Sequence, residues 1–308
     1  MSLPTLPTLF TLRSLALLLL LPLTLAAACF ADDKPVAEMP DAAPPDATAP
    51  DAAPNPLLVE RPYQHNVPDG YDPATPTPLL LLLHGYGAAG ALQAAYFGID
   101  AHARARGVLL AFPDGTENAM GDRFWNATDV CCGQGPDDVA YLSAVLDDME
   151  AHYTVDPKRI YVVGHSNGGF MAYRLACDVG HRIAGIVSLA GAMWKDPARC
   201  PAESDVAVLQ VHGDLDTTVE YGGTVFYPSA PQSVAFWAEQ NGCGAALTDG
   251  GRLDIEGGLA GEETRIERHA CTSGAAELWT IEGGGHVPSF GPGWSPALLD
   301  FLSAHPRP

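Results

Sequence analysis

The stretch that decides the fold of this chain is residues 159–169, RIYVVGHSNGG. An apolar run, Ile160–Val163, leads directly into the pattern Gly-x-Ser-x-Gly centred on Ser166, and a helix is expected over Gly168–Cys177. Glycines two residues before and after the serine leave room for a sharp turn between strand and helix. Such a turn exposes the hydroxyl and places it near the positive end of the helix dipole. The stretch therefore predicts Ser166 as a nucleophile.

Other short apolar runs along the chain resemble this strand in length and composition. They are Leu79–Leu83, Val108–Phe112, Ile186–Leu189, Val206–Val211 and Leu278–Ile281. Helical patterns or helix-start signals mark further segments, namely Pro136–His152, Pro231–Asn241 and Pro296–Ala304. Strands that alternate with helices are typical of an α/β fold, with a mostly parallel central sheet and helices on both faces. Because no internal repeat is visible, we expect one domain over residues 59–308.

A serine hydroxyl is a weak nucleophile near neutral pH and needs a base, which in turn needs a carboxylate to orient it. In a hydrolase of this architecture the chain order is Ser, acid, His. Asp216 follows the strand Val206–Val211 and is the preferred acid, with Asp214 as the second candidate. His286 follows the last predicted strand and three glycines, so it is the preferred base. His165 and His212 are expected to pack near the site.

An oxyanion hole requires two backbone N–H groups that point at the same oxygen. One is expected from Asn167, the residue after the nucleophile. The other is expected from the Gly-rich loop after an early strand, Leu83–Gly87, and we assign it to Tyr86. We expect no metal and no cofactor, because neither a zinc-binding nor a phosphate-binding motif occurs in the sequence. The glycines near 250 and 257–261 are expected to lie in surface loops.

Seven cysteines are present, and one of them, Cys29, lies in the N-terminal segment. The remaining six are disulfide candidates: Cys131, Cys132, Cys177, Cys200, Cys243 and Cys271. An even number in an exported domain is consistent with three disulfides, for which 15 pairings exist. We favour Cys243–Cys271, and Cys177–Cys200 is also consistent with the spacing. The adjacent Cys131 and Cys132 then pair with each other, or one of them pairs with Cys177.

The N-terminal segment has the pattern of an export signal over residues 1–30. A Leu-rich run too short to anchor in a bilayer follows Arg13 and ends in three alanines. Cys29 comes directly after them and is a lipidation candidate, although Ala26 stands where a lipobox usually has Leu. Residues 31–58 contain seven prolines, six acids and one lysine, which predicts a disordered, extended linker.

The net charge of the chain, −21, narrows the choice of partners. A nucleic-acid-binding protein needs a concentrated cationic face, so nucleic acid is excluded as a partner. The linker carries only −5 of the total, and the predicted domain is therefore acidic as well. A neutral substrate is expected, and contact with a membrane only through a lipid anchor on Cys29.

Several segments of the sequence occur together in an order that is familiar. These segments are LLLHGYG (81–87), Trp125 with CCG (131–133) and DDV (137–139), VDPKRIYVVGHSNGGFMAYRLAC (155–177), VHGDLDTTV (211–219), FWAEQNGC (236–243) and IEGGGH (281–286). Over residues 57–308 the chain resembles the secreted esterase family that contains poly(3-hydroxybutyrate)-depolymerase-like proteins and feruloyl esterases. The resemblance implies an α/β-hydrolase fold and a triad of Ser166, Asp216 and His286. It also supports Tyr86 and Asn167 for the oxyanion hole.

The chain departs from this family at two places close to the expected acyl pocket. Thr-Trp-Pro often follows the catalytic histidine of the family, whereas residues 287–289 are Val-Pro-Ser here. Glu220 stands where a proline is usual. Both departures concern the choice of substrate rather than the reaction, so the ester that is cleaved stays open.

The sequence thus predicts a serine carboxylic-ester hydrolase, exported to the periplasm or the extracellular space, that works through an acyl-enzyme on Ser166. Its expected substrates are small or oligomeric esters, including feruloyl and acetyl esters on polysaccharide and hydroxyalkanoate oligomers. Two alternatives are a non-catalytic binding lipoprotein on the same fold and a serine peptidase of the same superfamily. The Ser, Asp, His order disfavours the first, and the small size of the domain disfavours the second.

Overall fold

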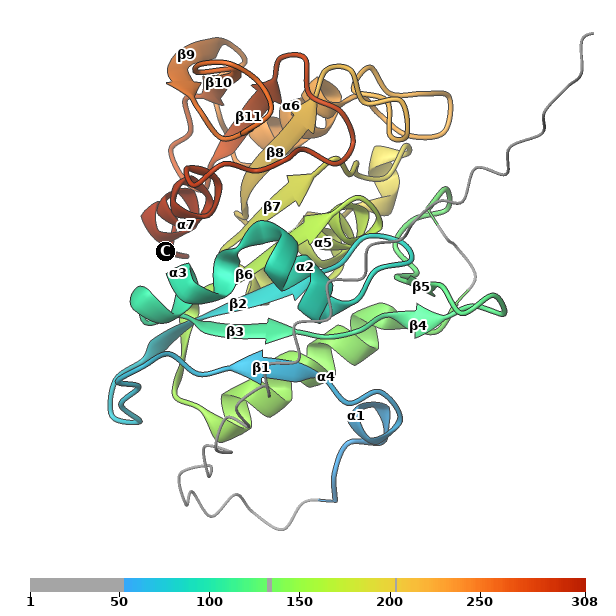
Figure 1. Cartoon of the computed structure of the whole chain (residues 1–308), viewed down its shortest axis with the longest axis vertical. Coiled ribbons are helices and arrows are strands. Elements are labelled where there is room, and N and C mark those ends of the chain that lie inside the picture. The colour runs from blue at the N-terminus through green and yellow to red at the C-terminus, as the bar shows by residue number, and fades with distance from the viewer. Residues whose placement is uncertain (1–52, 132–134, 203) are drawn as a thin grey trace, which may run out of the picture. The chain divides into compact units, whose positions relative to one another are not determined.

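The computed structural model describes residues 53–131, 135–202 and 204–308 (Figure 1). The expected export signal, Cys29 and most of the expected linker lie outside these residues. The last three residues of the expected linker, 56–58, are instead part of helix α1 (Pro56–Glu60). Asn55 caps this helix by accepting the N–H of Leu57 at 3.0 Å, and a proline suits the first helical position. No helix in the described residues is long and apolar enough to cross a bilayer.

A nine-stranded sheet forms the centre of the described domain, in the order β1-β3-β2-β6-β7-β8-β11-β10-β9. Its strands are β1 (Gln64–Asn66), β2 (Thr77–Leu83), β3 (Leu109–Phe112), β6 (Val155–His165), β7 (Gly185–Leu189), β8 (Ala207–Gly213), β9 (Leu247–Leu253), β10 (Thr264–His269) and β11 (Ala276–Ile281). The six strands from β3 to β11 pair in parallel, and β1, β10 and β9 add antiparallel edges. A small hairpin, β4 (Thr116–Glu117) and β5 (Arg123–Phe124), stands apart from the sheet.

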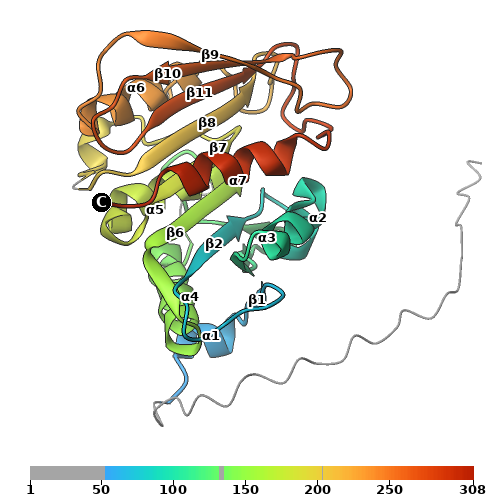
Figure 2. The same ribbon diagram turned by 90° about the vertical axis from the view of Figure 1, so that its left-hand side faces the viewer.

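Helices cover both faces of this sheet, as Figure 2 shows. They are α2 (Gly90–Phe97), α3 (Ile99–Ala105), α4 (Asp138–His152), α5 (Asn167–Val179), α6 (Ala230–Gln240) and α7 (Trp294–Ala304), with two short 3₁₀ turns at Gly180–Arg182 and Pro197–Arg199. Leucines 79–83 of β2 have no exposed surface, and they alternate between two apolar cores. One core holds side chains of α4 and α5, and the other holds side chains of α2, α3 and α7. The predicted fold, a mostly parallel sheet with helices on both faces, is confirmed.

The six predicted strands and four predicted helices are all present, within two residues at most ends apart from the longer β6. One expectation is wrong: Gly250 and Gly251 lie in strand β9 rather than in a surface loop. Gly250 packs so closely on Ile266 of β10 that a Cβ atom there would lie 2.4 Å from its side chain. The close approach of β10 leaves no room for a larger residue, which explains a glycine at position 250 of the strand.

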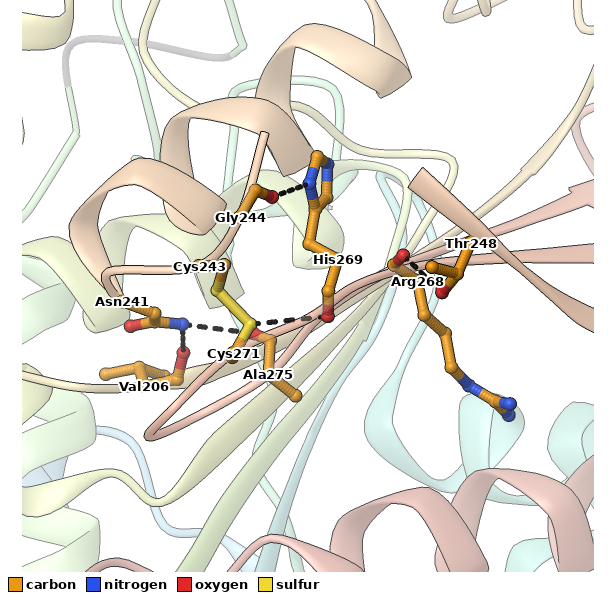
Figure 3. The surroundings of a disulfide bond; sticks show 9 residues. All are labelled: Val206, Asn241, Cys243, Gly244, Thr248, Arg268, His269, Cys271 and Ala275. Carbon is orange, nitrogen blue, oxygen red and sulfur yellow. Dashed lines mark hydrogen bonds between the residues drawn. A yellow bond between two sulfur atoms is a disulfide. The ribbon is translucent and has the colours of Figure 1, made fainter. Parts of the chain in front are cut away.

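Two disulfides link described cysteines: Cys177–Cys200 and Cys243–Cys271. Both pairings are among those expected from the sequence, and the second is the favoured one. The alternative in which Cys131 or Cys132 pairs with Cys177 is wrong, because Cys177 is bonded to Cys200. Cys243–Cys271 joins the end of α6 to the turn between β10 and β11 (Figure 3). Beside it, the side chain of Asn241 donates to the carbonyls of Val206 and Ala275 at 2.8 and 3.0 Å. Cys132 lies outside the described residues.

Candidate active site

Ser166 occupies a strained turn between β6 and α5, with φ 53° and ψ −119°. Few residues other than glycine adopt a positive φ, so the surrounding structure must hold this conformation. The N–H of Ser166 donates to the carbonyl of Leu189 at 2.8 Å. A Cβ on Gly164 would lie 2.0 Å from the Gly168 carbonyl oxygen, and one on Gly168 would lie 2.4 Å from that of Leu83. Both glycines of the sequence pattern are therefore required by close backbone packing.

His286 forms hydrogen bonds at both ring nitrogens with residues that are distant in sequence. Its Nε2 lies 2.9 Å from Oγ of Ser166, and its Nδ1 lies 2.7 Å from Oδ2 of Asp216. A carboxylate can only accept, so Nδ1 carries the proton and Nε2 accepts from the serine hydroxyl. The structure thus brings together the three residues that the sequence predicted as a triad, in the geometry of a nucleophile, a base and an orienting acid.

Asp216 is 5% exposed, and hydrogen bonds surround its carboxylate. Oδ1 accepts the N–H groups of Thr218 and Val219 at 2.8 and 3.0 Å. Oδ2 lies 3.3 Å from Nε2 of His212 as well as close to His286. Burial alone would raise the pKa of Asp216, but the hydrogen bonds from His212, His286 and Thr218 outweigh it and hold the pKa well below the ordinary range. The group is therefore a carboxylate at any pH near neutrality.

Asp214, the second candidate for the acid, lies elsewhere in the same loop. Its Oδ1 accepts the N–H of Gly283 at 2.7 Å, in the loop that leads to His286. Leu215, the residue after Asp214, donates its N–H to the Gly284 carbonyl at 3.0 Å. Asp214 therefore fastens the backbone before His286, whereas Asp216 contacts the imidazole itself.

The two histidines expected near the site, His165 and His212, do lie there, and both contact triad residues. Nε2–H of His165 donates to the main-chain carbonyl of His286 at 2.9 Å. Burial lowers the pKa of His165 to about 4, so its ring is neutral. His212 donates from Nε2 to the Val219 carbonyl at 2.7 Å and accepts at Nδ1 from Gln210 at 3.0 Å. Each histidine thus holds backbone beside the triad.

The two residues expected at the oxyanion hole belong to segments that adjoin Ser166. Asn167 is the first residue of α5, where backbone N–H groups lack partners within the helix. Tyr86 follows Gly85, whose backbone is so close that a Cβ there would lie 3.5 Å from Cβ of Ser166. The hydroxyl of Tyr86 donates to Asp122 at 3.1 Å, and its side chain is 47% exposed. Asn167, by contrast, is almost completely buried.

The segment after His286, where the sequence departs from the family that it resembles, is held by hydrogen bonds from two other segments. Ser289 N–H donates to Oε1 of Glu256 at 2.7 Å, and the hydroxyl of Tyr96 donates to the Pro288 carbonyl at 2.7 Å. Val287 itself is 63% exposed. The roles of Glu256 and Tyr96 could not be predicted from the sequence, because these contacts come from segments far from His286 in the chain.

Glu220, the other departure, uses its backbone in a way that proline could not. Its N–H donates to the hydroxyl of Tyr227 at 3.0 Å, and the Tyr227 ring meets Phe170 of α5 edge-on at 5.9 Å.

No group of three or more His, Cys, Asp and Glu side chains suited to a metal occurs in the described residues.

Comparison with known proteins places this site in a family context. Residues 137–230 match the model of the phospholipase/carboxylesterase family. NocK, a presumed esterase of Nocardia uniformis subsp. tsuyamanensis, is 31% identical over an alignment of 235 residues, and the match covers 70% of this chain and 67% of NocK. Feruloyl esterase D of Neurospora crassa is 24% identical over 243 residues, 74% of each chain. The solved structure of acetyl xylan esterase from Aspergillus awamori has the same fold, with a TM-score of 0.59, 13% identity, and coverage of 82% of this chain and 96% of that one.

Proposed function

Since this chain belongs to the esterases of the α/β-hydrolase superfamily, we propose that it hydrolyses carboxylic esters through an acyl-enzyme formed on Ser166. The observation that carries the proposal is the chain of hydrogen bonds from Ser166 through His286 to Asp216, with lengths of 2.9 and 2.7 Å. Ser166 is the nucleophile, His286 the general base and then the general acid, and Asp216 the group that orients the imidazole.

In the first half of the reaction, Oγ of Ser166 attacks the ester carbonyl carbon while Nε2 of His286 takes the hydroxyl proton. The carbonyl oxygen becomes an oxyanion in the tetrahedral intermediate. When the intermediate collapses, the C–O bond to the alcohol breaks, and the proton on Nε2 goes to the leaving oxygen. Asp216 stays ionised and stabilises the imidazolium that forms in between. The products of this half are the free alcohol and an acylated serine.

In the second half, a water molecule attacks the acyl-enzyme and gives a proton to Nε2 of His286. The second tetrahedral intermediate breaks its bond to Oγ of Ser166, which regains the proton from His286, and the carboxylic acid leaves. In both halves the N–H groups of Tyr86 and Asn167 are proposed to donate to the oxyanion. The start of α5 adds its dipole, since the negative charge develops at the N-terminus of this helix.

For the substrate we propose an uncharged ester whose acyl group is feruloyl, acetyl or hydroxyalkanoyl, with polysaccharide-linked esters as one form. The supports are the family resemblance, the relative named feruloyl esterase D, and the acidic composition of the domain. Leu215 and Val287, next to the acid and the base, are both more than 60% exposed and offer apolar surface to an acyl or alcohol group. A panel of methyl ferulate, acetylated xylan and 3-hydroxybutyrate oligomers decides between the three.

We also propose export from the cytoplasm, because two disulfides are expected to form and persist in an oxidising compartment. The export signal over residues 1–30 and the lipidation of Cys29 remain sequence predictions. Expression of the full chain in a bacterium with an export system tests both. Intact mass of the recovered protein gives the first residue, and a lipid-sized increment on Cys29 in the membrane fraction supports the anchor, whereas release into the medium contradicts it.

The proposed chemistry is tested with Ser166→Ala and a p-nitrophenyl acetate assay. The variant should lose all turnover above the rate of free imidazole or buffer, because no other hydroxyl is hydrogen-bonded to His286 in the described residues. Asp214→Asn serves as a folded control in the same preparation. Failure of a fluorophosphonate probe to label Ser166 would favour a non-catalytic protein on this fold.

A further inference from the structure

The two N–H groups proposed for the oxyanion hole come from separate parts of the fold. Tyr86 lies in the loop after β2, and Asn167 begins α5 after β6. Such donors stabilise an oxyanion only when both are held within hydrogen-bond distance of the same atom before the reaction begins. The distance between the loop and the helix must therefore be fixed before the reaction begins.

The side chain of Asn167 makes a two-way contact with the backbone of Trp125. Its Oδ1 accepts the N–H of Trp125 at 2.6 Å, and its Nδ2 donates to the carbonyl of the same residue at 2.9 Å. Nδ2 also points at Sγ of Cys131, 3.1 Å away. Both Asn167 and Trp125 are buried, so water does not compete for these bonds. The start of α5 is thereby attached to the segment just after β5.

The same tryptophan reaches the loop after β2 with its indole. Nε1–H of Trp125 donates to the main-chain carbonyl of His84 at 3.0 Å, and the two rings lie 5.0 Å apart. Burial lowers the pKa of His84, which is therefore neutral. Its Nε2 accepts from Gly115 N–H at 2.8 Å, and its Nδ1 donates to the carbonyl of Gly85 at 2.7 Å. His84 thus connects the indole to the backbone immediately before Tyr86.

A second bond from the same segment lies just beyond Tyr86. The N–H of Gly87 donates to the carbonyl of Arg123 in β5 at 2.8 Å. Residues 123–125 therefore hold the loop on both sides of Tyr86, through His84 before it and Gly87 after it. They hold the start of α5 through Asn167. One short segment, residues 123–125, therefore contacts both halves of the proposed oxyanion hole.

We infer that Trp125 is a positioning residue for the oxyanion hole, which fixes the separation of the Tyr86 and Asn167 N–H groups by bonding to His84 on one side and to the Asn167 side chain on the other. The inference rests on the proposed function. Trp125 has no exposed surface and acts only through these neighbours. Its loss should therefore weaken binding of the tetrahedral intermediate and leave binding of the planar ester unchanged.

The test compares Trp125→Phe with Trp237→Phe in the exported, disulfide-bonded protein. Phenylalanine retains most of the buried apolar volume and removes the indole N–H. Trp237 is a matched control, since it is also fully buried but its Nε1 has no hydrogen-bond partner among the described residues. For Trp125→Phe we expect kcat on p-nitrophenyl butyrate to fall about 10- to 100-fold, with KM within twofold of the wild type. Trp237→Phe should retain kcat within about threefold.

A second measurement separates positioning from a general loss of structure. An alkyl trifluoromethyl ketone forms a tetrahedral adduct with a catalytic serine and so occupies the oxyanion hole. Its affinity should fall in Trp125→Phe by the same factor as kcat. If Trp125→Phe has the same kcat as Trp237→Phe, or if its KM rises by the same factor by which its kcat falls, the inference is overturned.

Asn167→Ala provides an independent variant if Trp125→Phe does not fold. It retains the backbone N–H proposed as a donor and removes both bonds to Trp125. The same fall in kcat with unchanged KM is expected. When both single variants fold, kcat of the double variant should be no lower than that of the less active single variant, because either change breaks the same connection. If the two fold-losses in kcat multiply in the double variant, the inference is contradicted. If Ser166→Ala turns over the ester as fast as the wild type, the proposed function is refuted instead. The failure of the inference and the failure of the proposed function are therefore distinguishable.

Discussion

Nε2–H of His165, the residue before Ser166, donates a hydrogen bond of 2.9 Å to the main-chain carbonyl of His286. The residue next to the proposed nucleophile therefore holds the backbone of the proposed base. This bond requires a proton on Nε2 but no charge on the ring. Because His165 is buried, its pKa is lowered to about 4.

The lowered pKa predicts an acid-dependent loss of stability. An unfolded histidine titrates near 6.5, so between about pH 6.5 and pH 4 the unfolded chain binds a proton that the folded chain does not. The free energy of unfolding should therefore fall as the pH decreases through this range, by about 3 kcal/mol from this residue alone. In His165→Gln, which retains an N–H donor, this part of the pH dependence should disappear.

Urea unfolding at several pH values between 4 and 8 measures the effect. His181→Gln, a change at an exposed histidine, is the matched control and should follow the wild type. Parallel curves for the wild type and His165→Gln would contradict the assignment of a neutral, buried ring.

The two aspartates of the 213–219 loop should differ sharply in their effect on catalysis. Asp216→Asn replaces the acceptor of the His286 Nδ1 proton by an amide, which favours the wrong imidazole tautomer, so kcat should fall on the order of 10³-fold or more. Asp214→Asn removes only an acceptor of Gly283 N–H, and its kcat should stay within about tenfold. Steady-state kinetics on p-nitrophenyl acetate measure both. If Asp214→Asn loses more kcat than Asp216→Asn, the assignment of Asp216 as the acid is wrong.

The close approach of α5 to β2 predicts that Gly168 cannot be replaced. A methyl group on Gly168 would lie 2.4 Å from the Leu83 carbonyl oxygen and 2.6 Å from that of His84, so the helix must move away from the strand. We expect Gly168→Ala to lose about 1–3 kcal/mol of stability and most of its kcat. At Gly222 nothing lies within 4 Å of an added Cβ, and Gly222→Ala should behave as the wild type. Thermal unfolding and kcat, measured together, check both; an active and stable Gly168→Ala would contradict this packing.

Removal of the Cys243–Cys271 disulfide should destabilise the sheet edge without changing the site. The bond closes a segment with a sequence separation of 28, for which chain entropy predicts about 3–4 kcal/mol. The paired change Cys243→Ser with Cys271→Ser should lower the free energy of unfolding by about this amount. It should leave kcat within about twofold, since the disulfide joins the end of α6 to the β10–β11 turn (Figure 3). Chemical denaturation in non-reducing buffer measures the change in stability. Unchanged stability would contradict the expected effect.

The central strands, and the residues Ser166, His286 and Asp216 that the structure brings into contact, could be predicted from the sequence because each has a local signature. Strands buried on both faces appear as continuous apolar runs, as leucines 79–83 do. Chain order and position at strand ends were enough to select Asp216 and His286. The antiparallel strands β10 and β9 have no such run of apolar residues, and β9, at the edge of the sheet, is almost entirely exposed and contains two glycines. Pairing with a neighbour, rather than composition, makes them strands.

The contacts that hold the site could not be predicted in the same way. The bond from His165 to His286 joins residues 121 positions apart, and that from Asn167 to Trp125 joins residues 42 apart. Asn167 was selected for its backbone N–H, and nothing in the sequence indicated that its side chain binds another segment. Helices α2 and α3 were also missed, because they are short and are separated by Gly98 in the left-handed conformation.

The most direct test of the central claim is to trap the acyl-enzyme during turnover. The protein is mixed with p-nitrophenyl butyrate, quenched in acid within milliseconds to seconds, digested and analysed by mass spectrometry. We expect a butyryl group on Ser166 that appears with the first turnover and disappears as the substrate is exhausted, and no adduct in Ser166→Ala. Full ester turnover in Ser166→Ala, or an acyl group on another residue that forms and decays at the rate of turnover, would contradict it.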